Sequence, residues 1–249
     1  MRDYRYFDQC LDRLTGDVYS QPSDEGHTTW ASQAIEQMAI WVYKGNTAQR
    51  DRFKVLDVGC GQGFLYPIFK GIGMDWTGVA IGEDVEMAKE NLKTLGEDQS
   101  RVHAADMTFL PFRSGYFDLI FARHVLEHSP FPVITLMEWR RVVHDKGQLC
   151  LVAPAPHNWG YRGKNHYSIA PMPLLKWWTE RAGWHMTHEF TFTNRDPLYL
   201  KHLEPYQDGY VFPYDIPPPP KTKEEILESY PEGPVEFRLI CKAGEEVIE

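Results

Sequence analysis

A short apolar run followed by alternating glycines constrains the fold of this chain more than any other feature. The segment VLDVGCGQGF, residues 55–64, predicts a buried strand that contains Asp57 and is followed by Gly59, Gly61 and Gly63. Glycine lets the backbone turn sharply and lets a ligand lie against bare main chain. A helix after such a loop offers unpaired N–H groups in its first turn. The segment therefore predicts a ligand-binding unit of strand, loop and helix.

The rest of the core repeats this alternation of strands and helices. We expect further strands at 76–81, 101–106, 116–122 and 147–154, and helices at 63–73, 83–95 and 131–144. Later strands are expected at 183–193 and 234–244. Short apolar strands that alternate with helices are typical of a parallel sheet covered on both faces.

The two ends of the chain differ from this core. Apolar residues recur at helical spacing between Trp30 and Gly45, which predicts an amphipathic helix that ends at the glycine. Residues 194–234 are rich in proline and predict a long irregular connection with one short helix at 222–229. We therefore expect a single domain over 1–249, with a helical cap at 1–50, a core at 51–193, and an insert with the final strand at 194–249.

Composition excludes several classes of protein. The formal net charge of -9 argues against a broad nucleic-acid-binding surface, which would need a basic face. The 4 cysteines form no C-x-x-C pair, so neither a zinc site nor a disulfide framework is expected. Residues 1–14 lack the apolar core of a signal peptide, and no run is long enough for a membrane helix. We expect a cytoplasmic protein with a small-molecule partner.

Two kinds of cofactor loop share this strand–glycine–helix pattern. The dinucleotide version, G-x-G-x-x-G, needs a glycine or alanine where this chain has Phe64. A nucleotide-dependent oxidoreductase therefore remains only an alternative. The order Asp57-x-Gly59-x-Gly61-x-Gly63 instead resembles motif I of class I S-adenosylmethionine-dependent methyltransferases.

Downstream residues extend this resemblance over about 54–154. An acid follows the third strand at Asp106, "LPF" precedes "FD" at 110–118, and "LEH" follows the fourth strand at 126–128. This order is similar to the small-molecule methyltransferases that include the ubiquinone- and menaquinone-biosynthetic enzymes. The resemblance implies methyl transfer from S-adenosylmethionine to a small or medium-sized acceptor. With the element order, it predicts an α/β, Rossmann-like, mainly parallel seven-stranded sheet with the last strand antiparallel and helices on both faces.

The resemblance also implies a set of cofactor contacts. The glycines would pass beneath the methionine moiety, Asp57 would lie near its amino group, and Asp106 with the Met107 backbone would meet the adenine. Arg123 and His124 would close over the methionine end. The candidate cofactor-binding residues are Asp57, Gly59, Cys60, Gly61, Gly63, Ala80, Ile81, Asp106, Met107 and Arg123.

Ala80 departs from the family pattern. An acid is common at this position, where it binds both ribose hydroxyls, and losing hydrogen bonds to a charged acceptor costs roughly 1.5–3 kcal/mol. Glu83 and Asp84 follow closely and could replace it, although acids in a first helical turn also simply favour the helix dipole. The departure keeps open a second function, an S-adenosylmethionine-binding regulatory protein with weak or no catalysis.

The segment HVLEH, residues 124–128, also matches the inverted zinc-protease signature H-x-x-E-H. That signature works on a helix, where both histidines share one face, whereas this segment follows a strand and precedes a proline. We therefore expect no metal. Oxygen acceptors usually need a base, and the candidate catalytic residues are His128, His124 and His166. Further candidates on the acceptor side are His157, Tyr161, Arg162 and Tyr167.

Overall fold

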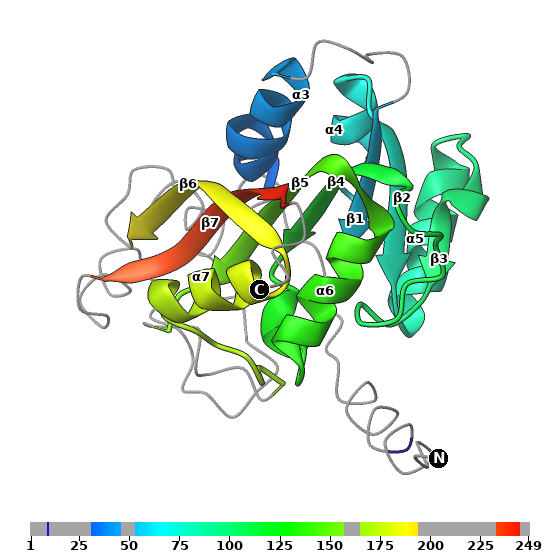
Figure 1. Cartoon of the computed structure of the whole chain (residues 1–249). Coiled ribbons are helices and arrows are strands. Elements are labelled where there is room, and N and C mark those ends of the chain that lie inside the picture. The colour runs from blue at the N-terminus through cyan, green and yellow to red at the C-terminus, as the bar shows by residue number, and fades with distance from the viewer. Residues whose placement is uncertain (1–8, 10–30, 46–52, 157–164, 194–232, 245–249) are drawn as a thin grey trace, which may run out of the picture.

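The computed structural model describes residue 9 and residues 31–45, 53–156, 165–193 and 233–244. Its centre is a seven-stranded sheet in the order β3-β2-β1-β4-β5-β7-β6 (Figure 1). The strands are β1 (Lys54–Val58), β2 (Asp75–Ala80), β3 (Val102–Ala104), β4 (Phe117–Arg123), β5 (Val143–Pro154), β6 (Trp184–Thr193) and β7 (Pro234–Ala243).

Strand directions confirm the predicted fold class. Strands β3, β2, β1, β4 and β5 run parallel to one another. Strand β7 is antiparallel to both β5 and β6. The order along the sheet reverses between β1 and β4. In open α/β sheets, ligands bind at the carboxyl ends of the strands beside such a reversal.

Helices cover both faces of the sheet, as predicted (Figure 1). One core contains buried residues of α6 (Pro132–Val142) and α7 (Met172–Arg181). The opposite core contains residues of the N-terminal helix, of α4 (Tyr66–Gly71) and of α5 (Glu83–Thr94). The N-terminal helix includes the π-helical segment η1 (Ile35–Ile40) and ends as α3 (Trp41–Gly45). Two 3₁₀ turns, η3 (Gln99–Arg101) and η4 (Leu126–His128), lie in the connections.

One helix boundary and one whole helix differ clearly from the sequence prediction. The helix expected to reach His144 ends at Val142, and Val143 takes extended backbone angles and pairs with Phe117 of β4. Two adjacent β-branched residues favour this change, and strand pairing then completes it. Helix α7 was not predicted. Pro173 stands in its first turn, where proline is tolerated, and Leu175 and Thr179 are buried.

The N-terminal helix confirms its predicted apolar face only in part. Ala34, Met38 and Val42 are buried, but Trp41 is 49% exposed and packs edge-on against His188. Within the described ranges, no helix is long and apolar enough to span a membrane. Trp30 and the expected helix at 222–229 lie outside the described residues. The division into cap, core and insert stays a prediction.

Candidate functional site

The glycine loop after β1 combines close packing with open space. Gly59, Gly61 and Gly63 have φ values of 69°, 50° and 75°, which favour glycine at all three positions. A Cβ on Gly59 would lie 2.2 Å from Val125 Cγ2, so this glycine lets the chain after β4 pack against the loop. A Cβ on Gly61 would meet no atom within 4 Å. The loop therefore leaves room for a ligand at Gly61.

Asp57 is buried beneath this loop. Its Oδ2 accepts a hydrogen bond from Trp76 Nε1 at 3.0 Å. Burial raises the pKa of Asp57 to about 7, although the Trp76 hydrogen bond lowers it in part. A cation placed nearby would stabilise the charged form of this carboxyl. The expected contact with a cofactor amino group stays a prediction, and the indole is the contact that the structure adds.

The end of β2 has no acid, as the sequence indicated, but an acid lies close by. Ala80 is buried and Ile81 is half-buried, and a Cβ on Gly82 would meet no atom within 4 Å. Asp84 is half-buried at the start of α5, whereas Glu83 is exposed. Burial raises the pKa of the Cys60 thiol well above its usual range, and the charges of Asp57 and Asp84 raise it further. Asp84 is therefore near the glycine loop.

Asp106 and Met107 follow β3 and are both half-buried. Asp106 Oδ1 accepts a hydrogen bond from the Thr108 N–H at 2.6 Å, which is the contact of a turn-forming aspartate. The Met107 carbonyl accepts a hydrogen bond from Trp139 Nε1 at 3.0 Å. Both residues are thus held in place at the carboxyl edge. The adenine contacts expected for them remain a prediction.

His124 stands at a strained position after β4. Its φ of 53° lies in the left-handed region, which is uncommon for a residue other than glycine. Its Nε2 lies 2.9 Å from Glu236 Oε2, and because a carboxylate only accepts, the imidazole N–H donates. Glu236 Oε1 in turn accepts from Arg238 Nε at 2.6 Å. Arg238 also donates through Nη1 to Gln37 Oε1 at 2.9 Å, so this network reaches the N-terminal helix.

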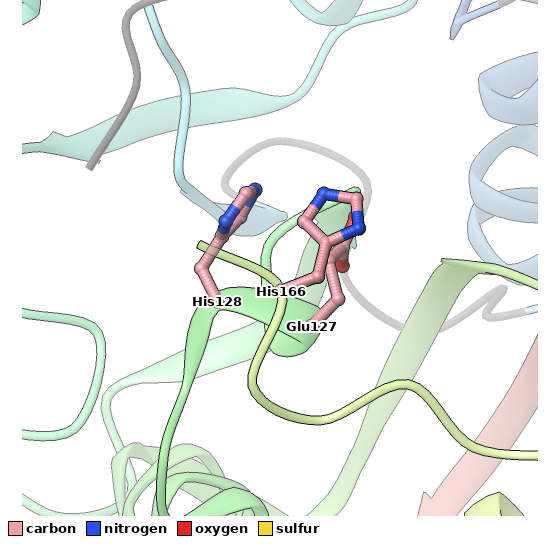
Figure 2. A group of neighbouring side chains, drawn as sticks. All are labelled: Glu127, His128 and His166. Carbon is pink, nitrogen blue, oxygen red and sulfur yellow. The ribbon is translucent and has the colours of Figure 1, made fainter. Parts of the chain in front are cut away.

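The other histidine of the HVLEH segment faces a different group. His128 and His166 lie edge to face with ring centroids 4.9 Å apart, and Glu127 lies beside them (Figure 2). Ligand atoms of these three residues lie within 4.8 Å of one another. The histidines of the H-x-x-E-H match therefore bind different partners, and η4 is a 3₁₀ turn instead of an α-helix. The match to the zinc-protease signature has no structural basis.

The structure thus brings together only part of the predicted acceptor side. His128 and His166 meet, while His124 bonds to Glu236. Tyr167 is exposed, and its backbone N–H donates to the Glu127 carbonyl at 2.7 Å. His157, Tyr161 and Arg162 lie outside the described residues. We did not predict Glu127 or Glu236. The one signal for Glu236 is a charged pair, Glu236 and Arg238, within the otherwise apolar run 234–241.

Comparisons with known proteins match the central part of the chain to a family of methyltransferase domains. Residues 56–151 match the family model described as a methyltransferase domain. A ubiquinone biosynthesis O-methyltransferase of Aromatoleum aromaticum is 31% identical over 97 residues, which are 39% of this chain and 42% of the relative. A malonyl-[acyl-carrier protein] O-methyltransferase of Legionella pneumophila is 32% identical over 110 residues, 41% of this chain and 37% of the relative. The chain thus spans about two-fifths of the length of these relatives.

Solved structures share the fold over most of the chain. A geranyl diphosphate methyltransferase in complex with SAM has a TM-score of 0.64 at 15% identity, covering 93% of this chain and 94% of that one. A SAM-dependent methyltransferase from Aquifex aeolicus has a TM-score of 0.54 at 16% identity, covering 85% and 93%. These likenesses confirm the Rossmann-like fold. With the family match, they confirm the resemblance stated from the sequence.

Proposed function

We propose that this chain, whose residues 56–151 carry a class I S-adenosylmethionine-dependent methyltransferase domain, transfers a methyl group to a small or medium-sized acceptor. The observation that supports this most is the open space at two adjacent strand ends. Both Gly61 and Gly82 could carry a Cβ without meeting another atom, and Asp57 and Asp84 flank them. Parallel pairing of β1 with β2 puts both loops at the same edge of the sheet.

The residues of this edge fit S-adenosylmethionine. When bound, the cofactor supplies a methyl group on a positively charged sulfur. Its ammonium and exocyclic amine are hydrogen-bond donors, and carboxylates are their best acceptors. We propose that Asp57 serves the ammonium and Asp106 the adenine amine, with Met107 beside the ring. Gly61 would leave the main chain bare under the ligand, beside Cys60, Ile81 and Arg123. Gly59 and Gly63 instead allow close packing against Val125 and α5.

We propose Asp84 as the substitute for the acid missing at Ala80. Asp84 is half-buried and its charge acts on Cys60 of the glycine loop, whereas Glu83 is exposed. Ribose hydroxyls donate well to a carboxylate, so Asp84 could supply the contact from the start of α5. Glu83 then only favours the helix dipole.

The acceptor would lie at the carboxyl end of β4, next to the cofactor loop. Val125 touches Gly59, so the segment 124–128 borders the glycine loop. Burial and the neighbouring His166 lower the pKa of His128 to about 4, although its bond to the Asn165 carbonyl raises it in part. A base of that pKa takes up protons weakly at neutral pH. We therefore assign proton removal to the group of Glu127, His128 and His166, and we assign no such role to His128 alone.

An oxygen on a small molecule is the acceptor that the relatives favour. Both relatives described above are named as O-methyltransferases. The acidic net charge of -9 argues against a nucleic-acid acceptor. We also propose a cytoplasmic location for the protein.

Calorimetric titration with S-adenosylmethionine and S-adenosylhomocysteine tests the proposal directly. We expect both to bind. The variant Asp84→Asn should bind about 10-fold more weakly, since a charged hydrogen bond is lost. Glu83→Gln is the matched control and should bind like the wild type. If a large excess of cofactor produces neither heat nor thermal stabilisation, the proposal is wrong. If both variants bind the cofactor equally well, Asp84 is not the ribose-binding acid.

Ala80 supports one rival function, a cofactor-binding protein with weak or no catalysis. The fold does not decide between the two, because the solved structures that share it include a [4+2]-cyclase, at a TM-score of 0.62 and 17% identity. Transfer of a labelled methyl group from the cofactor to phenolic and carboxylic acceptors separates them. The rival predicts that Ala80→Asp tightens cofactor binding without any turnover, and turnover by the wild type rejects it.

A further inference from the structure

Glu127, His128 and His166 bring one carboxylate and two imidazoles close together, and the proposed cofactor contacts use none of the three. Two residues come from the 3₁₀ turn after β4, and the third comes from the segment before α7, as Figure 2 shows. Backbone hydrogen bonds hold these segments together, because the Glu127 carbonyl accepts from the N–H groups of Tyr167 at 2.7 Å and Ser168 at 2.9 Å. His166 is therefore fixed beside Glu127 by the main chain.

Glu127 is a buried carboxyl whose two oxygens make no hydrogen bond within the described residues, although the imidazole of His124 and the charge of Arg123 lie nearby. Its side chain is 1% exposed. The nearest ring nitrogen of His124 lies 3.8 Å from Oε1, beyond hydrogen-bond distance. Leaving a buried carboxyl unpaired costs free energy, and buried charges are normally paired or bound to a metal. The Glu127 carboxylate oxygens are thus available to bind a cation.

His128 presents a nitrogen that suits a metal. Its Nδ1 lies 3.1 Å from the Asn165 carbonyl oxygen, which can only accept, so Nδ1 carries the proton. The second nitrogen, Nε2, therefore keeps its lone pair. Histidines that bind metals commonly donate their other N–H to a backbone carbonyl in this way, which fixes the tautomer and the ring.

We propose that Glu127, His128 and His166 form a binding site for a divalent first-row transition-metal ion such as zinc, manganese or cobalt. Two imidazoles and one carboxylate are a donor set that these ions accept, and three protein ligands leave coordination positions open. Ligands of a tetrahedral ion lie about 3.3 Å apart, given bond lengths near 2.0–2.1 Å. The ligand atoms lie within 4.8 Å of one another, so small side-chain rotations of the half-buried histidines would close the site.

The open position would face the acceptor. This part of the inference rests on the proposed function, whereas binding of the ion does not. An ion here would hold a hydroxyl or carboxylate oxygen of the acceptor and favour its deprotonated form. From the sequence we expected no metal, because HVLEH was not predicted to be helical. The site proposed here uses only two residues of that segment, together with His166 from elsewhere.

Metal binding is tested on the full chain after removal of ions with a chelator. Zinc titration by calorimetry and the visible absorption of added cobalt report binding and coordination without any catalytic assay. We expect one ion per chain, and His166→Ala should weaken binding at least about 100-fold. His185→Ala, which removes an exposed histidine of β6, is the matched control and should bind like the wild type.

The variant Glu127→Gln distinguishes loss of a metal ligand from loss of folding. It should also lose the ion, while its unfolding temperature without metal should equal or exceed that of the wild type. The inference is overturned if the wild type binds no ion, or if both His166→Ala and Glu127→Gln bind zinc as tightly as the wild type. Cofactor titrations run in parallel keep the outcomes distinct. Metal binding without cofactor binding would reject the proposed function alone, and the converse would reject the metal site alone.

Discussion

Two buried glutamates on either side of His124 have opposite surroundings. Glu236 accepts hydrogen bonds from His124 and Arg238, while Glu127 has no hydrogen-bond partner among the described residues. Burial alone would raise both pKa values. The His124 hydrogen bond, with the charges of Arg238, His124 and Arg123, instead lowers the pKa of Glu236 to about 2. Burial raises the pKa of Glu127 to about 8, and the charge of Arg123 lowers it only in part.

The difference separates a carboxylate that anchors the fold, Glu236, from one that we propose as functional, Glu127. Glu236 is charged at any pH at which the protein works, and its partners join β7 to the turn after β4 and, through Arg238, to the N-terminal helix. Glu127 follows His124 by three residues, and among the described residues its side chain makes no hydrogen bond that joins two elements of the fold. An unpaired buried carboxyl persists in a folded protein only when the surroundings impose it, and such groups gather at functional sites.

The largest effect should follow from removing the charge of Glu236. Glu236→Gln leaves Arg238, which is fully buried, without its carboxylate, and breaking a buried pair in this way costs about 3–5 kcal/mol. Urea unfolding at pH 7 measures the loss. The exposed pair of Lys176 and Glu189 provides the control, since Glu189→Gln should change the free energy of unfolding by less than about 1 kcal/mol.

The Glu236 effect should also depend on acidity. The folded pKa lies below the unfolded value of 4.5, so the stabilisation is present above about 4.5 and is lost as pH falls toward about 2. The wild type and Glu236→Gln should therefore converge in strong acid. A constant difference over this window would mean that Glu236 acts through shape and not through its charge.

Glu127 should show the reverse dependence, with a somewhat smaller effect. Its folded pKa of about 8 exceeds the ordinary 4.5, so the stability linked to its proton is complete below about 4.5 and is lost as pH rises through 8. In chelator, Glu127→Gln should match the wild type at pH 5 and exceed it at pH 9 by up to about 4 kcal/mol. If the free energies of unfolding of the two proteins change in parallel with pH, then Glu127 is charged and paired over the whole range.

The smallest effect should come from His124, which lies between the two glutamates. His124→Gly loses the hydrogen bond to Glu236 but relieves the left-handed backbone, so we expect a net loss of about 1 kcal/mol. His124→Ala loses the bond and keeps the strain, and it should lose about 1 kcal/mol more. Denaturant unfolding of both variants measures the difference. Equal stability of the two variants would contradict a strained His124.

The sequence predicts the sheet well because local pattern and fold agree there. Short apolar strands, the glycine loop and Asp106 follow one another in an order that the structure confirms for β1 to β4. The end of α6 was placed wrongly, since pairing of Val143 with Phe117 overrides the helical pattern. Helix α7 was missed because two prolines and loop-like residues precede the burial of Leu175, which is a tertiary effect.

The candidate site is predicted less completely, for a related reason. His128 and His166 were both expected on the acceptor side, yet nothing in their spacing shows that they meet or that Glu127 joins them. The partner of Asp57, Trp76, comes from the neighbouring strand, and that of His124 from β7. Contacts between residues distant in sequence leave no periodic signal, so sequence patterns identify the loops and only the fold identifies the pairs.

The place of β7 in the sheet has a consequence for the order of folding. Strand β6 pairs only with β7, and β7 separates it from β5, so β6 has no neighbour in the sheet until the later strand arrives. The bond between His124 and Glu236 spans 112 positions of the chain. On the ribosome, the cofactor loop and the first five strands can form early, while the turn bearing His124 gains its anchor only after residue 236 has emerged. Under the proposed function, synthesis therefore completes the cofactor-binding half of the site before the acceptor side.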